Sequence, residues 1–214
     1  MLLLILIICI IFVLFLISRV TENFNNNSRI KNTNYIFIHI PKNAGTSFSE
    51  KYCVGQPGHK NANDYSIEEL INSVAIVRNP YDRIISCYKY FKMKNNYWSK
   101  KYNASGNHTT LHDYCTKNSF KQFISDLYDK KIEKDIHLKP QSSFLKKDNK
   151  IYTKIMKLEN LNEDFYKIFN KKLDIPKLNK SDNYNIYIDQ ETKNKIYEMY
   201  KEDFELFGYP KNKL

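Results

Sequence analysis

The sequence contains little glycine, proline or cysteine. Five glycines and six prolines among 214 residues exclude a collagen-like chain and an architecture built on Gly/Ser linkers. One of the four cysteines, Cys9, lies in an apolar N-terminal run, and the three that remain allow at most one disulfide, which excludes a disulfide scaffold. No internal repeat is visible. In contrast, 17 tyrosines, 13 phenylalanines and a hydrophobic fraction of 42% are enough to build a core and exclude wholesale disorder.

Acidic residues are fewer than basic residues in this chain. The chain has 34 Lys and Arg residues against 23 Asp and Glu, a formal net charge of +11. Such an excess favours an anionic partner: nucleic acid, a lipid headgroup, a phosphate-bearing cofactor or an acidic glycan. The alternative is compositional, because the excess is mostly lysine in a chain equally rich in Asn, Ile and Tyr, as AT-rich coding produces. The charge therefore does not choose the partner.

Residues 2–17 form an uninterrupted apolar run. As a helix, about sixteen residues rise roughly 24 Å, near the lower limit for crossing a hydrocarbon core of roughly 30 Å. A cleaved signal peptide is the alternative, but a basic segment before the run and a small-x-small cleavage site before Phe24 are both missing. We therefore predict one N-terminal transmembrane helix, a signal anchor over residues 1–18, followed by a stem over 19–33 and one domain over 34–214.

Four N-x-S/T sequons also fit export to the secretory pathway. They lie at Asn26, Asn103, Asn107 and Asn179. A chain this rich in asparagine also forms several sequons by chance, and the charges flanking the apolar run say little about topology. Anchor and sequons together predict a single-pass type II protein of the Golgi or secretory-pathway membrane, with its domain in the lumen.

Apolar runs and helical spacing alternate along the rest of the chain. Strands are predicted over residues 35–40, 73–77 and 151–158. Helices are predicted from Thr46, after Pro80, over 120–128, over 161–169 and onward from a cap at Asp189, the last with Ile196, Tyr200, Phe204 and Phe207 at helical spacing. A polar excursion is predicted over residues 93–116. Strands that alternate with helices indicate an α/β fold with a parallel sheet covered on both faces.

The loop after the first predicted strand has the composition of an anion site. It has the sequence PKNAGTS, residues 41–47. Ala44 and Gly45 let the backbone approach a ligand closely, and the free N–H groups at the start of the next helix, with two hydroxyls, can cradle a phosphate. Lys42 adds a positive charge. The loop is not a Walker A motif, because the lysine precedes the glycine, and an ordinary strand-to-helix turn is the alternative.

The loop after the second predicted strand offers a second anion site. Arg78 ends a buried strand, where a guanidinium needs an anionic partner. Ser86, in the following helix, lies on a face that could point back toward Arg78, so the two could hold a phosphate. An ion pair between Arg78 and Asp82 that caps the helix is the alternative. Both loops follow strands of one predicted sheet, and ligands bind beyond the carboxyl ends of such strands.

PKNAGTS followed by VRNPYDRIISCYKYF strongly resembles the two nucleotide-binding motifs of sulfotransferases that use 3′-phosphoadenosine 5′-phosphosulfate (PAPS). The likeness is to the Golgi membrane-bound carbohydrate sulfotransferases of heparan sulfate, chondroitin and HNK-1 type. HLKPQ at 137–141, KLENL at 157–161 and YKEDFELFGY at 200–209 are similar to further family segments. The resemblance implies a P-loop-kinase-like parallel sheet flanked by helices, and metal-free transfer of a sulfuryl group from PAPS to a glycan hydroxyl.

The resemblance also implies roles for individual residues. The 5′-phosphosulfate would be held by Lys42, Asn43, Ala44, Gly45, Thr46 and Ser47. The 3′-phosphate would be gripped by Arg78 and Ser86. Asn43 replaces the Thr or Cys common in the family, a change that we expect to be tolerated because this position contributes mainly backbone.

Sulfuryl transfer needs a base for the acceptor's proton and a cation for the charge on the bridging oxygen. We predict that Lys42 supplies the cation. Of the five histidines, His59 resembles a family position that often holds the catalytic base, and we predict that it is the general base; a solvated loop histidine is the alternative. His39 is predicted to be structural. His137 and Gln141 are predicted to shape the acceptor or cofactor pocket, with direct catalysis by His137 as the alternative.

Metal and nucleic acid are not expected as partners. The spacing of His108, His112 and Cys115 could suggest a metal site, but a fourth ligand is not evident and we predict none. Lysines around Tyr97 and Trp98 could bind an acidic glycan, with a solvated loop as the alternative, while a lumenal domain would rarely meet nucleic acid. A protein-tyrosine sulfotransferase and a catalytically silent, membrane-anchored glycan-binding protein of the same fold are the rival functions. The oligomeric state is open.

Overall fold

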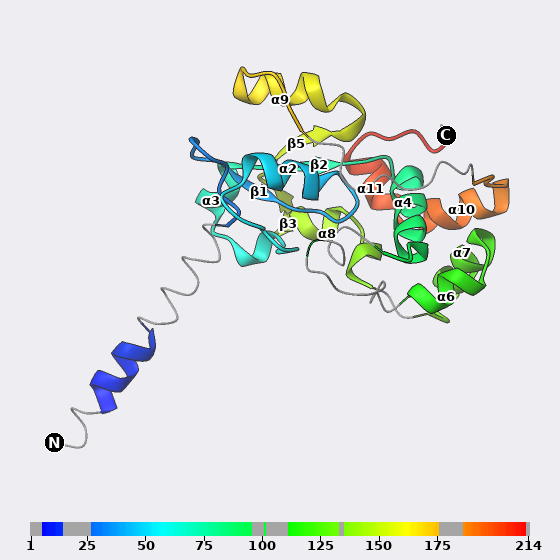
Figure 1. Ribbon diagram of the computed structural model, residues 1–214, viewed down its shortest axis with the longest axis horizontal. Helices are drawn as coiled ribbons and strands as arrows, with labels where there is room; N and C mark the ends of the chain where they lie inside the picture. Colours follow the sequence, from blue (N-terminus) through cyan, green and yellow to red (C-terminus); the bar gives the residue numbers. More distant parts are fainter. Residues whose placement is uncertain are drawn as a thin grey trace.

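A three-stranded parallel sheet lies at the centre of the domain (Figure 1). Its strands are β1 (Ile36–Ile38), β2 (Ser73–Val77) and β5 (Lys154–Lys157). The strand order is β1-β2-β5, so β2 is the middle strand and its carboxyl end lies beside that of β1. All residues of β1 and β2 are buried, as expected for parallel strands covered on both faces.

The computed structural model describes residues 6–14, 27–95, 101, 111–132, 135–175 and 186–212. The α-helices of the domain within these ranges are α2 (Gly45–Tyr52), α3 (Ile67–Ile71), α4 (Pro80–Lys92), α6 (His112–Lys117), α7 (Phe120–Tyr128), α8 (Ser142–Leu145), α9 (Leu161–Phe169), α10 (Gln190–Met199) and α11 (Lys201–Leu206). Short 3-10 helices are η1 (Ala62–Asp64), η2 (Ile136–Leu138) and η3 (Leu158–Asn160), and a separate hairpin joins β3 (Lys146–Lys147) to β4 (Lys150–Ile151).

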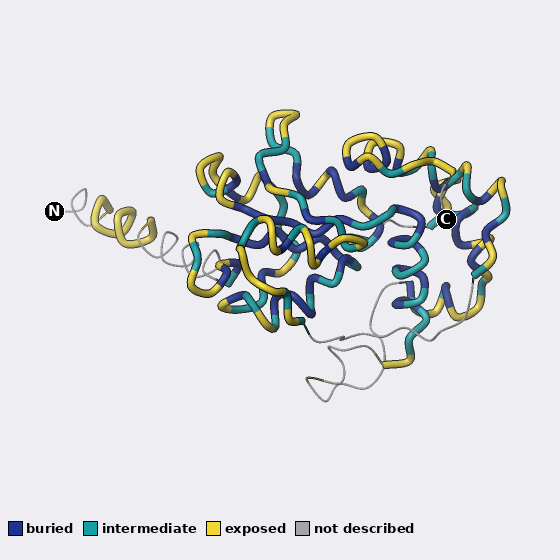
Figure 2. Tube along the Cα trace, turned by 90° about the horizontal axis from the view of Figure 1, so that it is seen from above, coloured by how far each residue is buried: buried dark blue, intermediate teal, exposed yellow. Residues whose placement is uncertain are grey.

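Helices cover both faces of the sheet. One face packs against α3 and α8 through Leu70, Phe144 and Leu145. The other face packs against α2 and α9 through Phe48 and Phe165. Figure 2 shows the buried part of the chain running through the middle of the molecule. The prediction of an α/β fold with a parallel sheet flanked by helices is confirmed.

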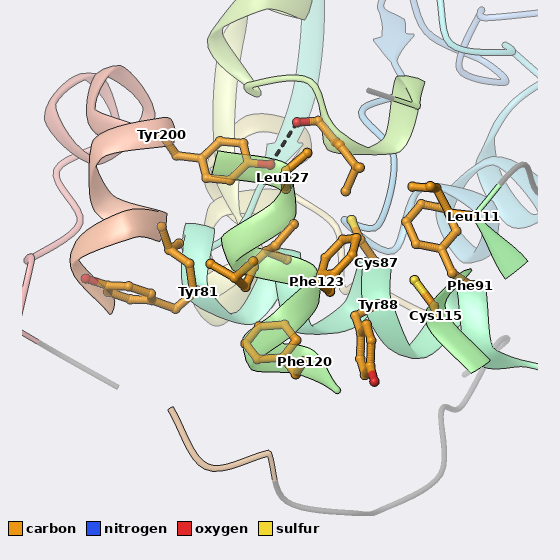
Figure 3. Packing of buried hydrophobic residues seen from close by; sticks show 14 of the residues in the cluster. Tyr81, Cys87, Tyr88, Phe91, Leu111, Cys115, Phe120, Phe123, Leu127 and Tyr200 are labelled. Carbon is orange, nitrogen blue, oxygen red and sulfur yellow. Dashed lines mark hydrogen bonds between the residues drawn. The ribbon is translucent and has the colours of Figure 1, made fainter. Parts of the chain in front are cut away.

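A second core, rich in aromatic side chains, lies among the helices beside the sheet (Figure 3). Tyr88 of α4 packs edge-on against Phe120 of α7, with the ring centroids 5.3 Å apart. Tyr200, between α10 and α11, donates its hydroxyl to the carbonyl of Leu138 at 2.8 Å. These contacts hold α4 from its buried side. Helix α4, which follows the loop after β2, is therefore packed against the other helices of this core.

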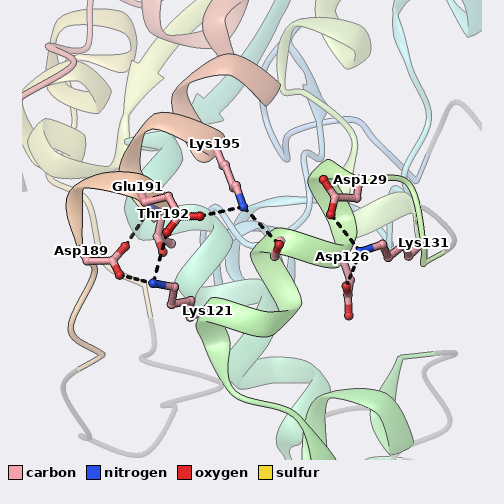
Figure 4. A network of polar contacts seen from close by, with 9 residues as sticks. Lys121, Asp126, Asp129, Lys131, Asp189, Glu191, Thr192 and Lys195 are labelled. Atoms are coloured by element: carbon pink, nitrogen blue, oxygen red, sulfur yellow. Dashed lines mark hydrogen bonds and ion pairs between the residues drawn. The ribbon is translucent and has the colours of Figure 1, made fainter.

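Ion pairs on the surface tie α10 to α7 (Figure 4). Lys121 of α7 lies 2.7 Å from Asp189, the cap of α10, and 3.3 Å from Glu191. Lys195 pairs with Glu191 at 3.0 Å and donates to Ser125 at 3.1 Å. The hydrogen bond from Lys121 lowers the pKa of the Asp189 carboxyl. Solvent screens ion pairs at the surface, so these pairs add little to the stability of the fold.

Two predicted elements are wrong in their extent. The strand predicted over 151–158 is divided between β4, which ends at Ile151, and β5, which begins at Lys154, because β4 pairs antiparallel with β3 whereas β5 pairs parallel with β2. Asp148 and Asn149, with φ angles of 50° and 59°, form the two-residue turn of the β3–β4 hairpin. The single last helix is two helices, α10 and α11, since the backbone leaves helical geometry at Tyr200, with φ −121°. The buried Tyr200 hydroxyl reaches the carbonyl of Leu138 from this break.

The predicted polar excursion over 93–116 contains a core element. Helix α6 places Cys115 in the aromatic core with 0% exposure. Helix α3 was not predicted, although Ser66 and Glu69 form a capping box at its start. All four cysteines are free thiols. The four sequon asparagines, with Tyr97, Trp98 and His108, lie outside the described residues.

The N-terminal apolar run is described only over residues 6–14. This segment is helical, and its large apolar side chains are 45–60% exposed. Among the described residues, no helix has both the length and the apolarity to cross a membrane. Residues 1–5 and 15–26 lie outside the described ranges, so the anchor over 1–18 and the stem over 19–26 stay predictions. The remaining stem residues pack on the domain: Ser28 is 0% and Ile30 3% exposed, and Ile30 forms a β-bridge with Cys53.

Helix α9 offers a matched pair of substitutions. Phe165 is 2% exposed and its ring centroid lies 5.0 Å from that of Tyr52, whereas its neighbour Tyr166 is 57% exposed. Phe165→Ala should lower the free energy of unfolding by about 3–5 kcal/mol because it leaves a cavity, and Tyr166→Ala should change it by about 0.5 kcal/mol or less. Urea denaturation followed by circular dichroism measures both. Equal losses would contradict the packing of α9 on the sheet.

Candidate functional site

The first loop, residues 41–47, is built to expose backbone N–H groups. Lys42 and Ala44 have φ angles of 69° and 57°, while Asn43 between them does not have a positive φ. Alternation of this kind turns successive N–H groups toward one side. Helix α2 then begins without a side-chain cap and without an acidic residue in its first turn. The start of α2 is therefore suited to an external anion.

Gly45 is required by the close approach of His39. A Cβ atom at position 45 would lie 1.9 Å from Cδ2 of His39, a distance that no side chain could accept. The imidazole of His39 is buried, and its ring stacks on Phe37 with centroids 5.8 Å apart. Burial lowers the pKa of His39 well below its usual value, so the ring is neutral at pH 7 and packs against the backbone of the loop at Gly45.

The second loop begins with Arg78, directly after β2. Asn79 caps α4 by accepting a hydrogen bond from the N–H of Tyr81 at 2.9 Å, and Pro80 occupies the first helical position. Ser86 lies further along the same helix. The alternative ion pair between Arg78 and Asp82 is not among the ion pairs of the described residues. The guanidinium therefore stays available to a ligand.

The two loops line one cavity of about 180 Å³ at the carboxyl ends of β1 and β2. Its lining consists of His39, Lys42, Ala44, Gly45, Thr46, Ser47, Arg78, Ser86 and Leu158. We call it the anion cavity, and within the described part of the chain its lining contains two basic side chains and no acidic one. Seven of the eight residues implied to hold the nucleotide line it, and Asn43 is the exception.

Asn43 and Gln141 join the two loops from below. The Asn43 side-chain N–H donates to the carbonyl of Ile76 at 2.8 Å and to Oε1 of Gln141 at 2.7 Å. The same Oε1 accepts the N–H of Arg78 at 2.9 Å, and Nε2 of Gln141 donates to the carbonyl of Arg78 at 2.8 Å. With both its hydrogens engaged, Asn43 leaves Oδ1 without a partner among the described residues. The amide of Gln141 therefore holds both loops in one arrangement.

This network bears on the roles predicted for Gln141 and Asn43. Gln141 is 0% exposed, the oxygen and the nitrogen of its amide are both hydrogen-bonded inside the fold, and it lines neither cavity, so the expectation that it binds substrate has no geometric support. The side chain of Asn43 is 1% exposed and points into the fold, which leaves its backbone as the only part near the ligand. Asp203, on α11, accepts the N–H groups of Gln141 and Ser142 at 2.7 and 2.8 Å, and so holds Gln141 in turn.

A second cavity, of about 280 Å³, adjoins the first. Its lining consists of His39, Pro41, Lys42, Thr46, Gln56, Gly58, His59, Tyr90 and His137. We call it the histidine cavity. It shares His39, Lys42 and Thr46 with the anion cavity. Lys42 thus lies at the boundary between a site suited to an anion and a site lined by three imidazoles.

The amine of Lys42 is held over an aromatic ring. Its Nζ lies 4.0 Å from the ring centroid of Tyr90, a cation–π contact. Burial lowers the pKa of Lys42 to about 8, a direction reinforced by the nearby charges of Arg78 and Arg83. The amine is mainly protonated at pH 7 and lacks an acidic partner among the described residues. A bound anion would therefore find an uncompensated charge.

His59 lines the histidine cavity with one nitrogen engaged. Its Nδ1 lies 3.3 Å from the carbonyl oxygen of His39. Since a carbonyl only accepts, Nδ1 carries the proton and Nε2 carries the lone pair. Burial lowers the pKa of His59 to about 4, so the ring is neutral at pH 7. The structure places His59 where a base could act, and its role as that base stays a prediction.

Four side chains at the site were not predicted from the sequence: Gln56, Arg83, Tyr90 and Asp135. Arg83, in α4, is 2% exposed and donates to the carbonyls of Pro41 at 3.1 Å and His137 at 2.9 Å. Arg83 is the second arginine of the VRNPYDR segment, so this motif could have identified it as a residue of the site. Tyr90 continues the helical face of α4 beyond Ser86. Within the described ranges, no group of His, Cys, Asp or Glu residues is arranged to hold a metal ion.

Comparison with known proteins gives one match. A family model described as Sulfotransferase family matches residues 29–210. This range includes both loops, the lining of the histidine cavity and helix α11. Neither a curated protein nor a solved structure matches the chain. The family assignment therefore rests on the family model, and the geometry above is independent of it.

Removing the amide of Gln141 should loosen the fold at the site. Gln141→Leu has similar volume but leaves the N–H of Arg78 and the amide of Asn43 without that acceptor, so the free energy of unfolding should fall by about 2–5 kcal/mol. Gln190→Leu, at an exposed position of α10, is the control and should change it by about 0.5 kcal/mol or less. Chemical denaturation measures both. A Gln141→Leu protein as stable as the control would refute the role of this amide.

Proposed function

Because the chain belongs to the sulfotransferase family, we propose that it transfers a sulfuryl group from PAPS to a hydroxyl of a carbohydrate acceptor. The observation that carries the proposal is the position of Lys42, shared by the anion cavity and the histidine cavity. Sulfuryl transfer requires a cation between the donor's leaving group and the acceptor, with a base close to the acceptor. Lys42 and the imidazoles of the histidine cavity support these two roles.

The anion cavity suits a nucleotide with phosphate at both ends. The uncapped start of α2 and the amine of Lys42 favour one anionic group, and the guanidinium of Arg78 with the hydroxyl of Ser86 favours another. The close contact of Gly45 with His39 keeps the loop backbone near the ligand. These features support PAPS as the donor and adenosine 3′,5′-bisphosphate as the product. The resemblance supports a P-loop-kinase-like fold for the domain.

The residues of the two cavities have different roles in sulfuryl transfer. PAPS supplies a sulfuryl group activated by its phosphate leaving group. Lys42, mainly protonated at neutral pH, stabilises the charge that grows on the bridging oxygen. Neutral imidazoles accept hydrogen bonds from an acceptor hydroxyl, and a histidine takes its proton. Among the described residues, the lining of the histidine cavity contains no carboxylate that would compete for the hydroxyl.

The carbohydrate acceptor and the cellular location are further parts of the proposal. The order of the family segments supports a glycan acceptor of the kind used by Golgi carbohydrate sulfotransferases. The apolar run at residues 2–17 supports a single-pass anchor in a secretory-pathway membrane, with the domain in the lumen. The net charge of +11 is consistent with an acidic glycan.

Transfer of labelled sulfate from PAPS tests the function. The protein is incubated with a panel of desulfated glycans and a tyrosine-containing peptide, and label on a glycan is expected. Lys42→Met should lower turnover at least about 100-fold because a cation at the reacting centre is lost. Lys150→Met, at an exposed hairpin position, is the control and should act like the wild type.

Three outcomes would contradict the proposal. Label on the peptide alone would overturn the carbohydrate acceptor. Binding of adenosine 3′,5′-bisphosphate without transfer to any acceptor would indicate a silent binding protein. Undiminished turnover in Lys42→Met would remove this lysine from the reaction.

A further inference from the structure

Asp135 and His137 form a carboxylate–imidazole pair at the edge of the histidine cavity. Asp135 caps the short helix η2 (Ile136–Leu138), where its Oδ1 accepts the backbone N–H of His137 at 2.8 Å. The same oxygen lies 2.5 Å from Nδ1 of His137. Both side chains are largely buried, with 14% and 17% exposure. The cap therefore places a carboxylate directly behind an imidazole that lines the cavity.

The ring of His137 is fixed from several sides. It packs against Tyr90 with centroids 5.1 Å apart, and against Phe91 at 5.9 Å and His59 at 5.6 Å. Its backbone carbonyl accepts hydrogen bonds from Arg83 at 2.9 Å and from the thiol of Cys87 at 3.2 Å. A catalytic base needs such a fixed orientation, because small displacements of the reacting atoms cost rate.

The hydrogen bond to Asp135 decides which nitrogen of His137 faces a ligand. A carboxylate accepts only, so Nδ1 carries the proton and Nε2 carries the lone pair. Among the described residues, Nε2 makes no hydrogen bond to protein. When Nε2 takes a proton, the imidazolium is stabilised by the adjacent carboxylate, which is the function of the buried aspartate in Ser-His-Asp triads.

His59 lacks this support. Its Nδ1 partner is the neutral carbonyl of His39 at 3.3 Å, and burial of its ring disfavours the charged form, with a pKa of about 4. A proton taken by His59 would stay on a desolvated ring without a carboxylate partner. Of these two histidines, His137 is the one with a carboxylate partner for the positive charge that a proton brings.

We propose that His137, oriented by Asp135, takes the proton of the acceptor hydroxyl, and that His59 positions the ring of His137 and the acceptor. This inference rests on the proposed sulfuryl transfer. The acceptor oxygen forms a bond to sulfur while the bond from sulfur to the bridging oxygen of PAPS breaks. The hydroxyl proton moves to Nε2 of His137, and the electron pair of the broken bond stays on the 5′-phosphate of adenosine 3′,5′-bisphosphate.

The test compares four variants of the full chain in the sulfate-transfer assay. His137→Ala should lower kcat about 100-fold or more, with the affinity for adenosine 3′,5′-bisphosphate unchanged, and added imidazole should restore part of the turnover. Asp135→Asn should lower kcat about tenfold or more at an unchanged KM for PAPS, because the carboxylate is lost. His59→Ala should lower kcat less than His137→Ala and should not respond to imidazole.

His112→Ala is the matched control. His112 is a partly buried histidine of α6 whose Nδ1 lies 2.7 Å from the carbonyl of Phe91, and it does not line either cavity. It should keep wild-type turnover with and without imidazole. This control separates rescue at the site from a general effect of imidazole on the assay.

Four results decide the inference. Rescue of His59→Ala by imidazole, with turnover kept in His137→Ala, would overturn it in favour of His59. If His137→Ala no longer binds the bisphosphate, His137→Asn replaces it, because the asparagine amide can still donate to Asp135. Wild-type turnover in His137→Asn would overturn the inference. Loss of turnover in His137→Asn with intact binding of the bisphosphate would support it. Absence of transfer by the wild type would instead refute the proposed function.

Discussion

The candidate site depends on the side-chain amide of Gln141. Its oxygen accepts from the side chain of Asn43 in the first loop and from the backbone N–H of Arg78 in the second, and its Nε2 donates to the carbonyl of Arg78. The backbone N–H of Gln141 donates to the carboxylate of Asp203. A buried polar network of this kind fixes one arrangement, because each broken contact leaves a desolvated group without a partner. The spacing between the two loops therefore follows from this amide.

Much of the fold could be predicted because its signals are local. Strand β2 and helices α7 and α9 have the predicted bounds, since apolar runs, helical spacing and caps lie within each segment. Both loops were predicted as anion sites from Lys42, the small residues Ala44 and Gly45, and Arg78. Parallel strand order then brings those loops together without further information. The turn of the β3–β4 hairpin, which was not predicted, and the break at Tyr200 depend on backbone angles that the apolar pattern does not report.

The parts that could not be predicted are contacts between distant segments. Gln141 lies in a segment that is similar to one of the family's sequence segments. The fold was needed to show that its amide is hydrogen-bonded to Asn43 and Arg78. Asp135 is two residues from His137, but their pairing matters only because η2 borders the histidine cavity. Tyr90 has the pattern of a core aromatic residue, and its contact with Lys42 joins two segments that lie far apart in the sequence.

The central claim is that the two loops bind opposite ends of one nucleotide. Calorimetric titration of adenosine 3′,5′-bisphosphate and adenosine 5′-monophosphate into the wild type and Arg78→Ala, at one salt concentration, tests it most directly. The account predicts that loss of the 3′-phosphate weakens binding to the wild type about tenfold or more, but weakens binding to Arg78→Ala less than about threefold. An equal loss in both proteins would show that Arg78 does not contact the 3′-phosphate, and would contradict the account.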